Sequence, residues 1–156
     1  LRGLDTMQVA AKVAEIIKNE HPDAVFVDGV GVGAGVVDRL NQLGFNVFDV
    51  LAGSTPDEKN KETYYNKRAE MWGRMRDWLE GADIPDDQDL VSDLIGPEYG
   101  YDNKMRIQLE KKEDMKKRGL ASPDAGDAIA LTFAYPTPPV QVHKQSDLMP
   151  EFFEDY

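Results

Sequence analysis

Residues 24–35 read Ala24-Val25-Phe26-Val27-Asp28-Gly29-Val30-Gly31-Val32-Gly33-Ala34-Gly35, an apolar run that leads into an aspartate and a glycine-rich turn. An apolar run without polar alternation predicts a β-strand buried on both faces, as in a parallel sheet covered by helices. Asp28 would lie at the carboxyl end of this strand, which is the edge where open α/β sheets bind ligands. The glycines allow a tight turn and leave space in front of the carboxylate. A plain Asp-Gly turn is the alternative interpretation.

The length and composition indicate one soluble globular domain. The chain has 156 residues, of which 41% are hydrophobic, and this is enough to form a core. It contains no cysteine, so disulfides and thiolate metal sites are excluded. No apolar run approaches the roughly 18–20 residues that span a bilayer, and the amino terminus lacks the pattern of a signal peptide. Because the chain starts at Leu1 without a methionine, we expect it to be a piece of a longer protein.

The charge balance argues against tight non-specific binding of nucleic acid by this domain alone. The formal net charge is −11, whereas contacts to phosphates are made mainly by Lys and Arg. The acids gather in two stretches, residues 83–93 and 147–156. Basic residues gather elsewhere, most densely in residues 111–118, so a local basic face is compatible with an acidic domain.

Periodicity and turn signals predict an α/β domain over residues 1–136, followed by an extended acidic tail over residues 137–156. Two strands, at residues 24–28 and 45–51, should pair in parallel through the helix between them. Strand-like alternation at residues 105–109 predicts a further strand or hairpin. The expected helices cover residues 5–18, 35–43, 60–80, 110–118 and 122–135, with a short helix or turn at 90–95.

The start of the last helix carries two aspartates. Ser122 is a suitable N-cap and Pro123 suits the first helical position. Asp124 and Asp127 are three residues apart, so they share one face of the helix. The helix dipole explains Asp124, because an acid in the first turn is favourable. Asp127 borders an apolar run that must be buried, and a buried carboxylate without a partner is costly. Asp127 therefore needs a cation.

Converging carboxylates predict a hard-oxygen site for Mg²⁺ or Mn²⁺. If Asp28 at the strand end and the aspartates of the last helix meet, they supply two or three such ligands. Sites of this kind hold paired ions roughly 3.5–4 Å apart and hydrolyse phosphodiesters by activating a water and stabilising the leaving oxygen.

Three ordered segments resemble the nuclease domain of the large terminase subunit of tailed bacteriophages, the motor protein that packages and cuts viral DNA. The resemblance is spread over about residues 4–135. Three segments together are far more specific than any one of them. The segments are HPDAVFVDGVGVGAGVVDRL at 21–40, NKRAEMW at 66–72 and EDMKKRGLASPDAGDAIA at 113–130.

The resemblance implies a ribonuclease-H-like fold, with a mixed sheet flanked by helices, and a metal-dependent endonuclease that cleaves double-stranded DNA by a two-metal mechanism. It implies that Asp28 is the second acidic ligand and Asp127 the last one, with Asp124 as an assistant. It also implies two Mg²⁺ or Mn²⁺ ions and a phage- or prophage-encoded protein in the cytoplasm of the bacterial host. The implied partners are double-stranded DNA, an upstream ATPase domain, the small terminase subunit and the portal or procapsid.

The chain departs from the family pattern at one important point. In this fold the first acidic ligand lies on the first strand of a leading hairpin sheet, whereas only a helix precedes the Asp28 strand here. The upstream ATPase domain with its phosphate-binding loop is also missing from the sequence. We therefore expect the metal site to lack its first acidic ligand and the first strands of the sheet. A chain of this kind should be inactive until they are supplied.

Basic residues near the last helix are the candidates for DNA binding. They surround the predicted carboxylate site along the chain, and include Lys104, Arg106, Lys111, Lys112, Lys116, Lys117 and Arg118. Basic residues of the long helix at 60–80, including Lys67 and Arg68, are assigned to a solvated face. The aromatic residues of that helix, including Trp72, are assigned to the core.

Two other functions are compatible with parts of the sequence. Gly29, Gly31 and Ala34 follow a strand in the spacing of a dinucleotide-binding turn, and Asp49 lies at the end of the next strand. A protein of that Rossmann-like class leaves Asp127 without a role. The third interpretation is a non-catalytic interaction domain that docks through its acidic tail and the aromatic residues Phe152, Phe153 and Tyr156.

Overall fold

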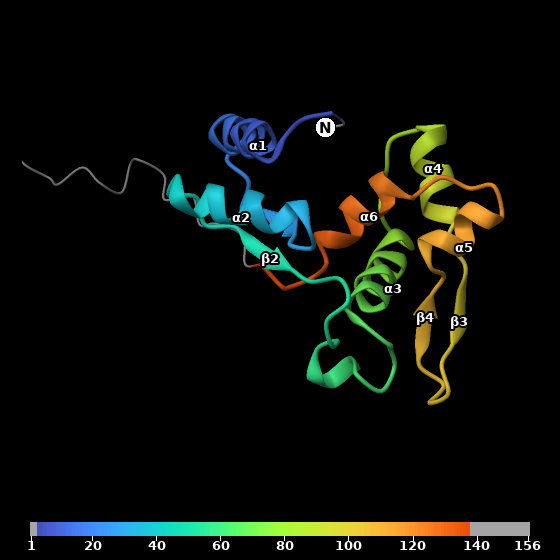
Figure 1. Ribbon diagram of the computed structural model, residues 1–156. Coiled ribbons are helices and arrows are strands. Elements are labelled where there is room, and N and C mark those ends of the chain that lie inside the picture. The colour runs from blue at the N-terminus through green and yellow to red at the C-terminus, as the bar shows by residue number, and fades with distance from the viewer. Residues whose placement is uncertain (1–2, 138–156) are drawn as a thin grey trace, which may run out of the picture.

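Two short parallel strands lie at the centre of the fold. The computed structural model describes residues 3–137 and has a mixed α/β architecture (Figure 1). Strand β1 (Phe26–Asp28) pairs with β2 (Phe48–Val50) in the register Phe26↔Phe48, Val27↔Asp49 and Asp28↔Val50. The helix between them makes the parallel crossover. Side chains alternate along a strand, so Asp28 shares one face with Val50, and Val27 shares the opposite face with Asp49.

Helices α1 (Thr6–Glu20) and α2 (Val32–Gln42) cover the Val27 face of the sheet. Helix α1 begins with a capping box, in which Asp5 accepts a hydrogen bond from the backbone of Gln8 and Gln8 reciprocates. Helix α2 ends before Gly44, whose φ of +83° suits a residue without a side chain. The buried residues of this layer are Ala10, Ala14, Val36, Val37, Leu40 and Val47.

Helices α3 (Lys67–Leu79) and α6 (Asp124–Leu131) cover the other face, the one that carries Asp28. In Figure 1 both helices lie between the β1–β2 layer and the remainder of the chain. Their core consists of Val50, Met71, Trp72, Met75, Ala130 and Ala134. The apolar residues of β1 and β2 on this face therefore pack against the second half of α6 and the residues that follow it.

A β-hairpin lies beside α3, and helix α4 (Gln88–Ile95) lies beside α6. Strands β3 (Tyr99–Tyr101) and β4 (Ile107–Leu109) form this antiparallel hairpin, and the bridge between Tyr64 and Ile107 attaches the chain before α3 to it. The other elements are η1 (Glu58–Asn60) and α5 (Lys112–Lys117). No helix of residues 3–137 is long and apolar enough to cross a membrane.

The structure corrects three expectations about the elements. Residues 24–27 are only half-buried and Asp28 is exposed, because the β1–β2 sheet has two strands within the described residues and the helices cover it incompletely. The long helix begins at Lys67 and not at residue 60, because Asn66 accepts a hydrogen bond from the Ala69 amide and caps it there. The last helix is capped by Asp93 and not by Ser122, as described below. The predicted acidic tail lies outside the described residues, except for Thr137.

A buried ionic network fixes α3 to its neighbours. The Lys67 ammonium lies 2.6 Å from Asp57 and 3.0 Å from Glu70, and the Lys67 and Glu70 side chains are 2% and 0% exposed. Arg74 contacts the same two carboxylates at 2.6 and 2.7 Å. It also donates to the carbonyl of Phe133, beyond the end of α6. The network therefore joins the loop before α3, α3 itself and the segment after α6.

The pKa of Asp57 is lowered chiefly by the hydrogen bonds from Lys67 and Arg74. Burial acts to raise the pKa of Glu70, but the hydrogen bonds from Asn60, Lys67 and the Asp57 amide outweigh it and lower that pKa. A carboxylate with a depressed folded-state pKa contributes stability that is present above its unfolded pKa and is lost as pH falls through the folded value. The network therefore weakens in acid.

We expect the free energy of unfolding to fall as the pH is lowered from 5. The Glu70→Gln variant leaves the buried Lys67 without its full countercharge, so it should lose roughly 3–5 kcal/mol at pH 7. It should also depend less on pH than the parent. Urea unfolding between pH 7 and pH 3 measures both effects, with the exposed Glu15→Gln as the matched control. A Glu70→Gln protein as stable as this control at pH 7 would contradict the assignment.

Candidate functional site

A cavity of about 310 Å³ opens between β1, α3, the start of α5 and α6. Asp28, Asp124 and Asp127 all line it. The two strands and the last helix thus bring the three acidic residues singled out from the sequence to one cavity. Its remaining walls are Ala52, Arg68, Met71, Trp72, Lys112, Ala128, Ala130 and Leu131.

Asp28 is placed by the glycine-rich turn. Its carboxylate accepts a hydrogen bond of 3.3 Å from the Val30 amide, and the side chain is exposed. Gly33, in the first turn of α2, packs against the end of β1, since a Cβ there would lie 1.7 Å from the Asp28 carbonyl oxygen. Only glycine allows this approach, so the turn both ends the strand and leaves the Asp28 side chain accessible from the cavity.

The first turn of α6 is held by Asp93 from α4. The Asp93 carboxylate accepts hydrogen bonds from the Ala125 amide at 2.8 Å and the Gly126 amide at 3.3 Å. A side chain at Gly126 would lie 2.9 Å from the Trp72 ring. The capping carboxylate and the glycine together let the start of α6 pack directly on Trp72, and this contact sets the position of Asp127.

Asp127 is surrounded by donors. Its Oδ1 accepts from Arg68 Nε at 3.1 Å and from Trp72 Nε1 at 2.9 Å, and its Oδ2 lies 2.8 Å from Lys112 Nζ. Burial acts to raise the pKa of Asp127, but the hydrogen bond from Lys112, the charge of Arg68 and the hydrogen bond from Trp72 together lower it. Asp127 is therefore an anion at neutral pH. The sequence predicts that this carboxylate needs a cation, and Arg68 and Lys112 supply the positive charge.

Arg68 is anchored on several sides. Its amide donates to the Ala52 carbonyl at 2.8 Å, and its Nη1 donates to the Glu110 carbonyl at 3.1 Å. Its guanidinium lies over the Trp72 ring, 5.9 Å from the ring centre. Within residues 3–137 the Arg68 Nη2 atom is buried and has no hydrogen-bond partner. A buried polar group without a partner is unfavourable by about 1–3 kcal/mol.

The carboxylates suit a hard divalent cation in their chemistry. The Lys112 ammonium at Asp127 Oδ2 shows that a cation is accommodated on the cavity side of that carboxylate. Within the described part of the chain, however, no group of three His, Cys, Asp or Glu side chains is arranged to hold a metal ion. The donor types therefore fit Mg²⁺ or Mn²⁺, whereas a closed three-carboxylate site is not formed by residues 3–137.

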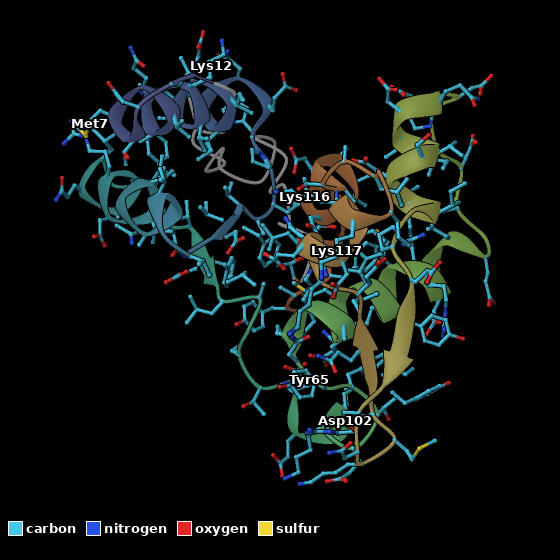
Figure 2. The ribbon with its side chains drawn as sticks, turned by 45° about the vertical axis from the view of Figure 1, so that its right-hand side comes forward. Met7, Lys12, Tyr65, Asp102, Lys116 and Lys117 are labelled. Atoms are coloured by element: carbon cyan, nitrogen blue, oxygen red, sulfur yellow. The ribbon has the colours of Figure 1, made fainter. Side chains whose placement is uncertain are left out.

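The candidate DNA-binding residues fall into two groups. Figure 2 shows Lys116 and Lys117 together on α5, whereas Asp102 lies at the turn of the β3–β4 hairpin. Arg106 is held by Asp102 through contacts of 2.9 and 2.6 Å, and Lys117 contacts Asp114 at 2.7 Å.

Other members of the set are also engaged. Arg118 binds Glu110 and Glu98 and is therefore a structural tie between α5 and the hairpin. Lys112 pairs with Asp127. Lys104, Lys111 and Lys116 form no salt bridge with residues 3–137, and all three side chains belong to exposed residues. Of the proposed DNA-binding residues, Lys112 is the one that lines the cavity.

Arg68 and Trp72 both bind Asp127. The helical pattern predicts a solvated face for Arg68, which is wrong, and a core position for Trp72, which is confirmed although its contact with Asp127 was not predicted. They are four residues apart on α3, so they project from the same face of the helix. Their occurrence in the NKRAEMW segment was the available signal, because it pairs a cation and an indole N–H at this spacing.

The acidic residue of the dinucleotide-binding interpretation lies on the opposite face of the sheet from the cavity. Asp49 is the register partner of Val27 and packs against the glycine turn. A Cβ on Gly29 would lie 1.6 Å from the Asp49 Oδ1 atom. Asp49 thus fills the space beside the turn. The partners of Asp127 are different residues, Arg68, Trp72 and Lys112. The arrangement favours a site built around Asp127.

Comparison with known proteins identifies the fold. No protein-family model matches the chain, and no curated protein sequence matches it. Among solved structures, the nuclease domain of the large terminase subunit of bacterial virus Sf6 is similar, with a TM-score of 0.65 and 19% identity over 82% of this chain and 72% of that one. A mutant of that domain with manganese has a TM-score of 0.65 and 21% identity, over 81% of this chain and 72% of that one. The same mutant with calcium has a TM-score of 0.64 and 20% identity, over 81% of this chain and 71% of that one. The resemblance to terminase nuclease domains is therefore confirmed at the level of the fold.

Replacement of Trp72 by Phe removes the Nε1 donor from Asp127 and keeps an aromatic ring in the core. Because that hydrogen bond favours the charged carboxylate, the pKa of Asp127 should rise in the Trp72→Phe variant. Carbon-13 NMR titration of the Asp127 carboxyl measures the shift. The half-exposed Trp78 on the same helix supplies the matched control, Trp78→Phe, which should leave this pKa unchanged. Equal titration curves for the two variants would contradict the proposed contact.

Proposed function

We propose that this protein is a metal-dependent endonuclease with a ribonuclease-H-like fold that cleaves the phosphodiesters of double-stranded DNA during phage DNA packaging. The observation that carries the proposal is the cavity that Asp28, Asp124 and Asp127 line together, from two distant parts of the sequence. The fold likeness to nuclease domains of a large terminase subunit supports it. Metal-bearing structures of that domain, with manganese or calcium, support the use of a divalent ion.

The residues have separate roles in this proposal. Asp28 and Asp127 would hold the metal, Mg²⁺ or Mn²⁺, with Asp124 as an assistant, and the bound ions would activate a water and stabilise the leaving oxygen. Asp127 is kept ionised by Arg68, Trp72 and Lys112, so it is ready to bind a cation at neutral pH. Because residues 3–137 do not arrange three acidic ligands, we propose that a further acidic ligand is needed for cleavage.

Lys112 has to exchange its partner before Asp127 Oδ2 can bind a metal ion. Its side chain is 44% exposed and lies at the first residue of α5, so it is able to withdraw into solvent. A DNA phosphate is a suitable new partner for this ammonium, and Lys111 and Lys116 on the same segment extend the basic surface. We propose that the DNA backbone runs along α5, next to the cavity.

The acidic balance of the chain indicates that further contacts to DNA come from other parts of the packaging machinery. With a net charge of −11, the domain is poorly suited to bind DNA tightly by itself. We propose that an ATPase domain, the small terminase subunit and the portal or procapsid are the partners. The site of action is the cytoplasm of the infected bacterial host.

Plasmid cleavage by the protein with the further acidic ligand supplied tests the function. With Mn²⁺ or Mg²⁺, supercoiled DNA should be converted to nicked or linear forms, and EDTA should abolish this. Asp28→Asn and Asp127→Asn should each lower the rate at least about 100-fold, as expected for the loss of a metal ligand.

The matched control is Asp49→Asn, on the neighbouring strand but on the opposite face of the sheet. This variant should cleave like the parent. Cleavage that persists in Asp28→Asn or Asp127→Asn, or that is lost only in Asp49→Asn, would refute the assignment of the site.

A further inference from the structure

The two oxygens of Asp127 lie in different environments. Oδ1 accepts from two donors on α3, Arg68 and Trp72, whose side chains are largely buried. Oδ2 contacts Lys112, whose side chain is 44% exposed. Oδ1 is therefore fixed to the body of the protein, whereas the partner of Oδ2 can exchange.

Arg68 contacts Asp127 through one guanidinium nitrogen, Nε, and not through two. In the two other arginine pairs of this region, Arg118 with Glu110 and Arg106 with Asp102, both Nε and Nη2 contact the carboxylate. Arg68 uses Nε alone, and its Nη2 is buried without a partner in residues 3–137. The unused donor shows that the Asp127 carboxylate is turned so that Oδ2 faces Lys112 instead of completing a two-point pair with Arg68.

Arg68 is itself restrained from several directions. The carbonyls of Ala52 and Glu110 accept from its amide and its Nη1, and Trp72 lies against its guanidinium plane. These contacts come from the loop after β2, from the end of β4 and from α3. Asp127 is thus held by a side chain that cannot follow it if the carboxylate rotates.

We propose that Arg68 is a positioning residue, which holds Asp127 by Oδ1 and thereby presents Oδ2 to the divalent cation of the site. The inference rests on the proposed metal-dependent function and assigns to Arg68 a role that its charge alone would not give. Lys112 occupies the position toward which Oδ2 is directed, and Arg68 determines that direction.

Because Arg68 and Lys112 are both cations on the same carboxylate, the direction in which removal of each one changes metal affinity tests the positioning role. If Arg68 and Lys112 were only countercharges, removing either would leave the site more negative and would tighten the binding of a divalent cation. A positioning role predicts opposite effects for the same change in charge. Loss of Lys112 removes a competitor of the metal at Oδ2, whereas loss of Arg68 releases Oδ1 and lets the carboxylate turn away.

The experiment measures Mn²⁺ affinity of the intact protein by electron paramagnetic resonance, without DNA. Lys112→Gln should bind Mn²⁺ more tightly than the parent. Arg68→Gln should bind about 10-fold more weakly, in the range found when partners of metal ligands are removed. Arg68→Lys keeps the charge but loses the fixed fork, so it should also bind more weakly than the parent. Thermal unfolding and near-ultraviolet circular dichroism identify variants that remain folded.

The outcomes separate this inference from the proposed function. Tight binding in the parent that is lost in Asp127→Asn, with opposite effects of Arg68→Gln and Lys112→Gln, supports both. Tighter binding in both of these variants, or parent-like binding in a folded Arg68→Lys, overturns the positioning role and leaves the metal site intact. A parent protein that binds no Mn²⁺ overturns the metal site and the positioning role together. If Arg68→Gln does not fold, the result for Arg68→Lys decides.

Discussion

The Asp127 carboxylate is the group on which the arrangement of the site depends. It lies at the start of α6 beside an apolar core, where an ionised group requires compensation. Arg68 and Trp72 supply it from α3, and Lys112 supplies it from α5. A single carboxylate therefore joins three helices. The same contacts lower its pKa and keep it anionic, which is the state needed to bind a metal ion.

Helix α3 contributes residues to the core, to the ionic network and to the site. Its apolar residues pack on the sheet and on α6, whereas Lys67, Glu70 and Arg74 form the buried network with Asp57. Arg68 follows Lys67 directly, so the network that anchors the first turn of α3 also limits the movement of the Arg68 backbone. The stability of α3 and the geometry at Asp127 are thus coupled. Acid conditions that weaken the network should disturb the site as well.

The sequence predicted the local elements and the acidic residues better than it predicted their partners. Local signals mark the apolar run before Asp28 and the aspartates at the start of α6. The structure places Asp28, Asp124 and Asp127 at one cavity. The start of α3 was placed too early, because the cap at Asn66 outweighs the helical pattern before it. The contact between Arg68 and Asp127 was not predicted, because an arginine on a helix has the same local pattern whether it faces solvent or a distant carboxylate. The capping of α6 by Asp93 likewise depends on a contact between segments far apart in the chain.

Anomalous X-ray scattering from crystals grown with Mn²⁺, measured at the manganese absorption edge, tests the central claim most directly. We expect a peak in the cavity between the Asp28 and Asp127 carboxylates, with Lys112 withdrawn from Oδ2 and Arg68 still bound to Oδ1. Manganese bound elsewhere, with Lys112 still paired to Asp127, would contradict it.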